Sequence, residues 1–287
     1  MDGKTCVITG ATSGVGLHAA LRFAEGGANI VIVCRHLQKG ERVAANLQQK
    51  YNTDTKLIQA DFSRLADVRN TAKAITESGI KVDVLINNAG IHRTTRTLTD
   101  DGHEIVFCVN HLASFLFTRL LLESMLEHPP AKILQISSQG HRFGGLDLND
   151  LTWAKRAYRG LQGYGASKVA QLLTVWEFAE MLAGTGVTIN AIHPGEVRTN
   201  IGMDNGSIYR FYQKYLLGPF LPSPKESGEA IYYLAAAPEM LDANGYFFNR
   251  TTEEKPAAHA LDRTLGKKVW KISEELTGLS PWDITAR

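Results

Sequence analysis

Six short runs of apolar residues recur along the chain, each bounded by residues that favour turns. They are residues 5 to 10 (TCVITG), 29 to 34 (NIVIVC), 56 to 61 (KLIQAD), 82 to 87 (VDVLIN), 132 to 137 (KILQIS) and 187 to 193 (VTINAIH). Continuous apolar runs of this length are typical of strands buried on both faces of a parallel sheet. One more short strand is predicted at residues 245 to 248 (GYFF), at the edge of the sheet.

Segments with helical periodicity lie between these runs. They include residues 17 to 27, which end in glycines, and residues 167 to 186, and a further helix is predicted to start near Lys225. This alternation predicts an α/β fold, a doubly wound (Rossmann) parallel sheet of about seven strands with helices on both faces. No repeat, low-complexity tract or linker interrupts the pattern, so we expect residues 1 to 287 to form a single domain.

One region, residues 200 to 224, departs from this alternation and mixes glycine, proline and aromatic residues. Such a loop is a candidate lid over a ligand, and a surface loop packed by its own aromatic residues is an equally good interpretation. As a lid it would provide an apolar wall made of Tyr209, Phe211, Tyr212, Tyr215 and Phe220.

The composition is that of an ordinary globular protein, with 44% hydrophobic and 21% charged residues in a chain of 287. The net charge of +2 comes from interspersed charges without a run of lysine or arginine, so nucleic acid is not an expected partner. The first residues, MDGKTCVITG, do not resemble a signal peptide. We also expect no membrane span, because no stretch approaches the ~20 apolar residues that one requires.

The cysteines, Cys6, Cys34 and Cys108, are odd in number and widely spaced. This pattern indicates neither a disulfide framework nor a zinc site, and the histidines lack metal-ligand spacing, so no metal is expected. We interpret the cysteines as small buried hydrophobic residues in a reducing compartment, which favours a cytoplasmic location.

A glycine-rich stretch, TGATSGVG at residues 9 to 16, follows the first predicted strand and opens the first helix. Gly10 permits a tight turn, Gly14 allows the backbone to approach a phosphate, and Gly16 allows helix and strand to pack. The spacing is looser than the usual dinucleotide fingerprint, and a purely structural turn is the minor alternative.

The second predicted strand ends in Cys34 and Arg35, where a protein that binds NAD usually carries an acidic residue. The Arg35 guanidinium is suited to the 2′-phosphate of NADP(H), which favours that cofactor, although an exposed loop charge remains an alternative. Lys39 is interpreted as a solvated helix residue.

Tyr164 and Lys168, in the stretch GYGASK, stand four residues apart and therefore share one face of a helix. Lowering the pKa of a tyrosine from ~10 to neutrality requires roughly 4 kcal/mol. A positive charge at ~4 Å supplies about this much at an effective dielectric of ~20. The alternative is a chance pairing on an amphipathic helix, with the lysine extending to water.

Together, TGATSGVG, NNAG (87 to 90), VNH (109 to 111), ISS (136 to 138), YGASK and HPGEVRT (193 to 199) resemble the short-chain dehydrogenase/reductase family, whose motifs occur in this order. The resemblance covers nearly the whole chain. Within the family, CRHLQKGE, CVNHL and AIHPGEVRT are most similar to the retinol dehydrogenase branch.

The resemblance implies a role for each of four polar residues. Tyr164 would be the general acid and base, and Lys168 would lower its pKa and hold the nicotinamide ribose. Ser138 would bond the substrate oxygen, with Ser137 as the competing assignment, and Asn110 matches the asparagine that holds a water in the proton relay. Hydride transfer to a carbonyl develops charge on oxygen, which is the charge that such donors stabilise.

The resemblance also implies the cofactor contacts. Asp61 would meet the adenine, and Asn88 is as well explained by bonds to the backbone of neighbouring strands as by contact with the cofactor. The full set of residues expected to bind the cofactor is Gly10, Thr12, Ser13, Gly14, Val15, Gly16, Arg35, Asp61, Phe62, Asn88, Ala89, Gly90, Tyr164, Lys168, Pro194, Gly195, Val197 and Thr199.

One departure from the family lies between Ser138 and Tyr164, whose separation of 26 positions is about double the common interval. Residues 141 to 160 are therefore read as an insertion near the active site, in which His141 and Trp153 are candidates for the pocket or for packing. Helices at 103 to 127 and 163 to 184 would form the family's usual homodimer contact unless this insertion blocks it.

The sequence thus predicts an NADP(H)-dependent oxidoreductase that interconverts a carbonyl and an alcohol on a lipophilic small molecule, in the reductive direction. The alternative from another class is a noncatalytic NADP(H)-binding regulator or scaffold. A sugar epimerase or dehydratase is a weaker rival, because the likeness to those chains is confined to the fold and the Tyr164 and Lys168 pair.

Overall fold

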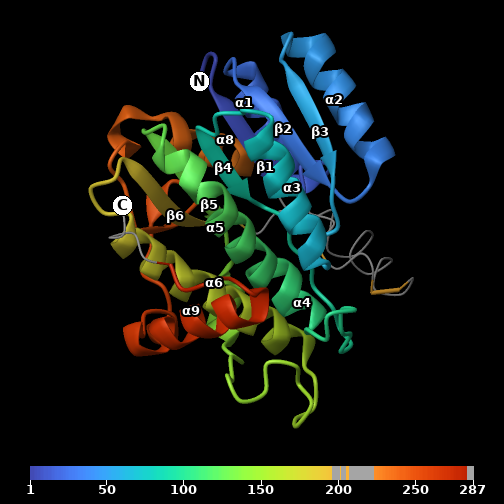
Figure 1. The fold of residues 1–287 in the computed structure, drawn as a ribbon, viewed down its shortest axis with the longest axis vertical. Coiled ribbons are helices and arrows are strands. Elements are labelled where there is room, and N and C mark those ends of the chain that lie inside the picture. The colour runs from blue at the N-terminus through green and yellow to red at the C-terminus, as the bar shows by residue number, and fades with distance from the viewer. Residues whose placement is uncertain (196–200, 202–204, 207–222, 283–287) are drawn as a thin grey trace.

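A single sheet organises the protein, for which the computed structural model describes residues 1–195, 201, 205–206 and 223–282 (Figure 1). Within these residues the sheet has eight strands in the order β3-β2-β1-β4-β5-β6-β7-β8. The strands are β1 (Thr5–Thr9), β2 (Asn29–Cys34), β3 (Thr55–Gln59), β4 (Val84–Asn87), β5 (Ala131–Ile136), β6 (Val187–His193), β7 (Phe247–Asn249) and β8 (Thr252–Glu253). The doubly wound fold is therefore confirmed.

Helices cover both faces of this sheet. They are α1 (Gly14–Glu25), α2 (Leu37–Tyr51), α3 (Leu65–Glu77), α4 (Ile105–Phe107), α5 (Ala113–Leu126), α6 (Gly160–Met181), α8 (Lys225–Ala236) and α9 (Arg263–Thr277). A π-helical turn (Cys108–Leu112) joins α4 to α5, and a 3₁₀ turn (Gln139–Phe143) follows β5.

The strands β1 to β7 pair in parallel, as their apolar composition predicts. The strand expected at residues 245 to 248 overlaps β7. It is not the edge of the sheet, as the sequence predicted, because β8 pairs antiparallel with the outer side of β7. A two-residue strand such as β8 gives too short a pattern to be seen in the sequence.

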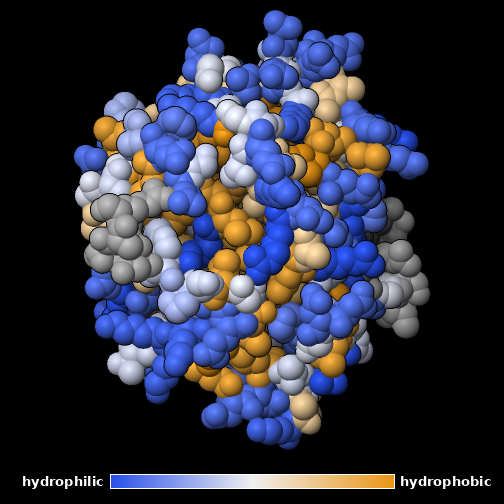
Figure 2. Space-filling view, viewed as in Figure 1, coloured by the Kyte–Doolittle hydropathy of each residue, from blue (hydrophilic) through white to orange (hydrophobic). Residues whose placement is uncertain are grey.

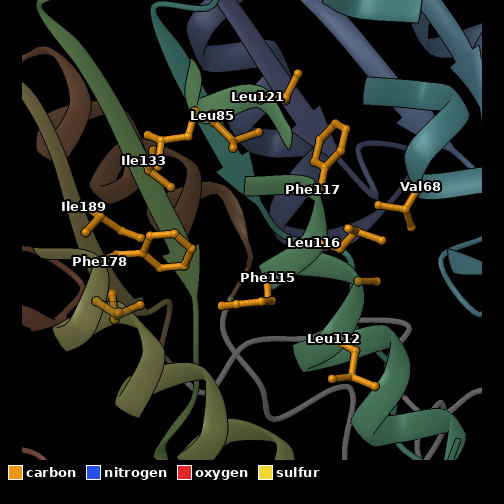
Figure 3. Packing of buried hydrophobic residues seen from close by; sticks show 14 of the residues in the cluster. Val68, Leu85, Leu112, Phe115, Leu116, Phe117, Leu121, Ile133, Phe178 and Ile189 are labelled. Atoms are coloured by element: carbon orange, nitrogen blue, oxygen red, sulfur yellow. The ribbon is translucent and has the colours of Figure 1, made fainter. Parts of the chain in front are cut away.

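The two faces of the sheet carry separate apolar cores. One core lies under α1, α2 and α8, and the other, larger one lies under α3, α5, α6 and α9. Figure 3 shows α5 in the second core, where Leu112, Phe115, Leu116 and Phe117 lie among side chains of the strands and of α3 and α6.

α9 packs against α6 and α5, the helices that were expected to form a homodimer contact. Every residue from 165 to 179 in α6 is buried. The Trp270 ring of α9 lies 4.6 Å from that of Phe178 and 5.0 Å from that of Phe115, and Arg119 of α5 pairs with Glu274 of α9 at 2.6 Å. α9 thus covers one side of α6, and the homodimer contact and its obstruction by the 141–160 insertion stay predictions.

Residues 141 to 160, the predicted insertion, are held together by hydrogen bonds and contacts among themselves. The Asp150 carboxylate accepts hydrogen bonds from the backbone N–H groups of Ala154 and Lys155, and the Arg156 guanidinium lies 3.7 Å from the centre of the Trp153 ring. The Tyr158 hydroxyl donates to the buried carboxylate of Glu104 at 3.1 Å. These bonds fix the insertion against the chain that enters α4.

One stretch among the described residues, Ile105–Leu126, is long and apolar enough to cross a membrane, with 83% of its most apolar window buried inside the protein. The expectation that no such stretch exists was wrong. The stretch was missed because polar residues such as Asn110, His111 and Arg119 stand among its apolar residues. A core helix of a globular protein passes the same test of length and composition. On the face viewed in Figure 1, apolar residues also reach the surface near the middle, among hydrophilic ones (Figure 2).

Candidate active site

A cleft of about 850 Å³ runs along the carboxyl ends of the parallel strands. It spans the point where the strand order reverses, between β1 and β4, which is where doubly wound sheets bind their ligands. Its walls combine the glycine loop after β1, the segment after β2, and the ends of β4, β5 and β6. The predicted site residues from distant parts of the chain therefore meet in one cavity.

The glycine loop forms the floor of this cleft at the N-terminus of α1. Gly10 and Gly14 have φ of 70° and 55°, in the region that favours glycine. Thr12, Ser13, Gly14 and Val15 line the cleft, whereas Gly16 does not. A Cβ on Gly16 would collide with the Asn88 side chain, so Gly16 serves the packing of helix against strand rather than contact with a ligand.

Positive charge gathers at the end of the cleft beside β2. Arg35, His36 and Lys39 line it, and the Arg35 Nε–H donates to His36 Nε2 at 3.3 Å. Asp61 and Phe62, expected at the adenine, line the same cavity. Lys39 is exposed in the first turn of α2, as expected of a solvated helix residue, and it also lines the cleft.

Asn88 bonds the backbone of neighbouring segments, as one of its two interpretations predicted. Its Nδ2 donates to the carbonyl oxygens of Thr9 and Gly10 at 2.9 and 3.2 Å. Asn88, Ala89 and Gly90 all line the cleft, as do Pro194 and Gly195 after β6. Val197 and Thr199 lie outside the described residues, as do the aromatic residues of the predicted lid.

Ser138 and Tyr164 lie together in the cleft and share a hydrogen bond. The Ser138 Oγ also accepts the Gly140 N–H at 3.0 Å, which holds the serine at the start of the 3₁₀ turn. Gly140 packs directly on the tyrosine, since a Cβ there would stand 2.5 Å from the Tyr164 ring. The competing residue, Ser137, lines the cleft too, but its buried hydroxyl has no hydrogen-bond partner among the described residues. The geometry favours Ser138.

Lys168 lies one helical turn after Tyr164, with its Nζ 5.6 Å from the centre of the Tyr164 ring. It is 3% exposed, and its ammonium donates to the Ile136 carbonyl at 3.0 Å and to Gln171 Oε1 at 2.9 Å. Burial lowers the pKa of Lys168 to about 7.

The expected direction of the tyrosine shift was wrong for this structure. Burial raises the pKa of Tyr164 above its usual value, while the hydrogen bond from Ser138 lowers it by a smaller amount. Burial also disfavours the charged form of Lys168, which weakens the effect that its ammonium was expected to have on the pKa of Tyr164. Helical spacing predicted the contact but carries no information about this desolvation.

Asn110 stands in the π-helical turn between α4 and α5 and is fully buried. Its side chain donates to the Ile91 carbonyl at 3.0 Å and to Ser167 Oγ at 2.9 Å, and it accepts from the Ile91 N–H at 2.8 Å. Its backbone carbonyl accepts from the side chains of Ser114 and Gln171. Asn110 therefore acts behind the cleft wall and does not line the cavity itself.

The two pocket candidates of the insertion do not line the cleft. Trp153 is 4% exposed and packs against Tyr158 and Arg156. His141 is fully buried, with its Nδ1 2.7 Å from the Ser138 carbonyl and its Nε2 accepting the Ala257 N–H at 3.1 Å. Both are packing residues, and His141 joins the Ser138 turn to the segment after β8.

Several cleft residues were not among the predicted site residues, and four of them bear on the chemistry of the site. The His92 ring lies 5.8 Å from the Tyr164 ring, edge to face, and His193, at the end of β6, has its pKa lowered to about 4 by burial. Phe143 and Leu161 line the cleft with 52% and 58% of their surface exposed. The available signal was their position, because His193 opens the HPGEVRT motif and the other three lie within a few residues of NNAG, ISS or GYGASK.

Comparison with known proteins gives consistent matches over the chain. The model of a family described as short chain dehydrogenase matches residues 4–207. Retinol dehydrogenase 13 from Homo sapiens is 37% identical over 284 residues, which cover 97% of this chain and 86% of that protein.

Solved structures extend this likeness to the fold. An uncharacterised protein from Mycobacterium paratuberculosis has a TM-score of 0.78 at 29% identity, covering 98% of this chain and 96% of that one. A short chain dehydrogenase from Burkholderia cenocepacia, solved in complex with NADP, has a TM-score of 0.69 and covers 86% of this chain and 96% of that one. At 23% identity this second likeness shows the fold alone.

Proposed function

The chain belongs to the short chain dehydrogenase family, and on that premise we propose that it is an NADP(H)-dependent oxidoreductase that interconverts a carbonyl and an alcohol on a lipophilic small molecule. The observation that carries the proposal is the set of Ser138, Tyr164 and Lys168 in one cleft with the glycine loop. Reduction is the proposed direction.

The cleft has the features that a dinucleotide phosphate requires. The glycine loop and the N-terminus of α1 would hold the pyrophosphate, because their backbone N–H groups favour an anion. Arg35, with Lys39 beside it in the cleft wall, would hold the 2′-phosphate. Lys168 would hold the nicotinamide ribose. The cofactor, when bound, supplies the hydride that reaches the carbonyl carbon.

The protein's own part in reduction is to supply a proton and hydrogen bonds to the carbonyl oxygen. The Ser138 and Tyr164 hydroxyls line one cleft and share a hydrogen bond, so both would donate to a carbonyl oxygen bound beside them. The Tyr164 proton passes to the substrate oxygen as negative charge develops there, so that an alcohol forms. Lys168, one turn away, favours the resulting phenolate until Tyr164 regains a proton.

The charge state of the site supports the reductive direction. Because burial raises the pKa of Tyr164, the phenol keeps its proton at neutral pH and is ready to act as an acid. Oxidation of an alcohol would require the phenolate at the outset. Lys168, whose pKa lies near 7, is poised to exchange a proton over the same range.

Apolar side chains at the mouth of the cleft support a lipophilic substrate. Phe143 and Leu161 are two of the few large hydrophobic side chains exposed among the described residues, and both line this cavity. Isolated exposed apolar residues need no explanation, but two at the rim of one cleft favour an apolar ligand.

The first experiment is a binding titration with NADPH, NADH and their oxidised forms, followed by a panel of apolar aldehydes and ketones with nicotinamide absorbance as the readout. We expect tighter binding of NADPH than of NADH, and oxidation of NADPH in the presence of a carbonyl. Tighter binding of NADH would refute the cofactor assignment, and absence of binding would refute the proposal as a whole.

Replacing Tyr164 separates an enzyme from a noncatalytic regulator. We expect Tyr164→Phe to lose turnover while it keeps NADPH affinity, because only the hydroxyl that transfers the proton is removed. Tyr158→Phe is a matched control, since Tyr158 bonds Glu104 outside the cleft. Equal activity of the two variants would contradict the assigned role of Tyr164.

A further inference from the structure

Gln171 connects two of the residues already described. Its Oε1 accepts from the Lys168 ammonium at 2.9 Å, and its Nε2 donates to the backbone carbonyl of Asn110. Gln171 is 1% exposed and lies one helical turn beyond Lys168 on α6. A buried side-chain amide thus spans the distance between the Asn110 carbonyl and the catalytic lysine.

The local hydrogen bonds explain why a polar residue is tolerated in this apolar helix. A buried ammonium must be hydrogen-bonded, and Lys168 has two acceptors, the Ile136 carbonyl and Gln171 Oε1. Both the oxygen and the nitrogen of the Gln171 amide have a hydrogen-bond partner, so the bridge leaves neither atom unpaired. A leucine at this position would fill the same space and leave the lysine with one of its acceptors.

We propose that Gln171 is a positioning residue, which fixes the Lys168 ammonium by bridging it to the backbone carbonyl of Asn110, the residue that the family resemblance led us to expect to hold a relay water. The proposal rests on the proposed function, because it assigns a role to Lys168 in that reaction. It adds a residue that the motifs of the sequence do not include.

The bridge has a consequence for proton supply. A water between two polar groups can accept one proton and release another, whereas a carboxamide accepts at oxygen and donates at nitrogen without passing a proton on. Gln171 therefore passes no proton between the Asn110 carbonyl and Lys168. Lys168 also lines the cleft, so we expect the proton that restores Tyr164 to arrive from the cleft side.

Titration of Lys168 in the cofactor-free protein tests the bridge without relying on activity. The measurement is the ¹³Cε NMR shift of labelled lysine against pH, with Lys168→Met to assign the signal. The other titratable groups that face Lys168 are Tyr164 and His193, and none of the variants at position 171 alters them.

Three substitutions of Gln171 give distinct expectations. Gln171→Met removes the acceptor at nearly constant shape, so the proton affinity of Lys168 should fall about tenfold or more. Gln171→Glu places a negative charge at the same position, so the affinity should rise by a similar factor. Gln171→Ala leaves room for a water to act as acceptor, so the titration should stay closer to the native one than that of Gln171→Met.

The direction in which each variant shifts the titration of Lys168 decides the outcome. Unchanged titration in Gln171→Met and Gln171→Glu, or shifts of the same sign in both, would overturn the proposal, because general loosening of the core cannot produce opposite signs. If Gln171→Met does not fold, the upward shift in Gln171→Glu carries the test alone.

Kinetics separate this proposal from the proposed function. With a carbonyl substrate that the protein reduces, the pH at which kcat declines should shift among the Gln171 variants in the same order as the titration of Lys168. The melting temperatures of these variants should follow no such order. If the native protein reduces no carbonyl but the titrations shift as expected, the reaction assignment fails and the bridge stands. If it is active and the pH profile of Gln171→Met is native, the bridge fails and the reaction stands.

Discussion

Gly140 provides a direct test of how closely the tyrosine must be held. Replacing it by alanine adds a methyl group whose carbon would lie 2.5 Å from Cε1 and 2.7 Å from Cδ1 of the Tyr164 ring. Carbon atoms pack favourably at about 3.5–4.0 Å, so the ring or the 3₁₀ turn must move by roughly 1 Å. The same turn places Ser138, whose Oγ accepts the Gly140 N–H, so both hydroxyl donors shift.

The expected cost of this movement is large for catalysis and moderate for stability. A misplacement of ~1 Å can reduce a rate about 10²-fold, which corresponds to ~2.7 kcal/mol of transition-state stabilisation. Overpacking in a dense region costs roughly 1–3 kcal/mol of folding free energy. We therefore expect Gly140→Ala to fold, to bind NADPH with nearly native affinity, and to lose kcat by about two orders of magnitude.

Gly144→Ala is the matched control from the same turn. No atom lies within 4 Å of the Cβ that it would add, but φ is +64°, so the substitution strains the backbone without a clash. It should lower the free energy of unfolding by about 1–3 kcal/mol and leave kcat near the native value. Steady-state kinetics, NADPH titration and urea unfolding of both variants form the assay. Native kcat in a folded Gly140→Ala protein would refute the assigned contact.

Three further predictions concern the cofactor, pH and assembly. Arg35→Ala should weaken NADPH binding about 10- to 100-fold and leave NADH binding unchanged, because one charge-assisted bond to a phosphate is lost; equal losses for both nucleotides would contradict the role of Arg35. Burial lowers the pKa of His111 to about 3, so its contribution to stability is complete above the unfolded value of ~6.5 and is lost as pH falls toward 3. The free energy of unfolding should therefore fall with a slope of up to ~1.4 kcal/mol per pH unit in that window, and His111→Gln should have a shallower slope in urea titrations. Because α9 buries α6, light scattering should give the mass of one chain, 31.5 kDa, and twice that mass would contradict the assigned cover.

The sequence predicted the parts of the site that depend on local spacing. The apolar runs located the parallel strands, and the four-residue interval of Tyr164 and Lys168 predicted their common helix face. The glycine loop was placed correctly against the first helix, because its chemistry is confined to a few adjacent residues.

What the sequence did not predict depends on contacts between distant segments. The pKa of Tyr164 is set by burial, which no local pattern reports. Trp153 was a pocket candidate, yet its ring is taken up by Arg156 and Tyr158 within the insertion. No sequence pattern indicated a role for Gln171, because only the packing of α6 against the π-helical turn brings it to the Asn110 carbonyl.

The attachment of α9 has a consequence for the order of events during biosynthesis. His111, next to Asn110 in the chain, bonds Ser273 of α9 at 2.7 Å, and Trp270 closes over the rings of α5 and α6. α9 follows the described strands of the sheet in the chain, so a nascent chain emerging from the ribosome holds α6 with one apolar side uncovered until α9 has been synthesised. Domains in this condition are prone to aggregation and are natural clients of chaperones. The wall behind the catalytic lysine is therefore completed only after the sheet that it covers.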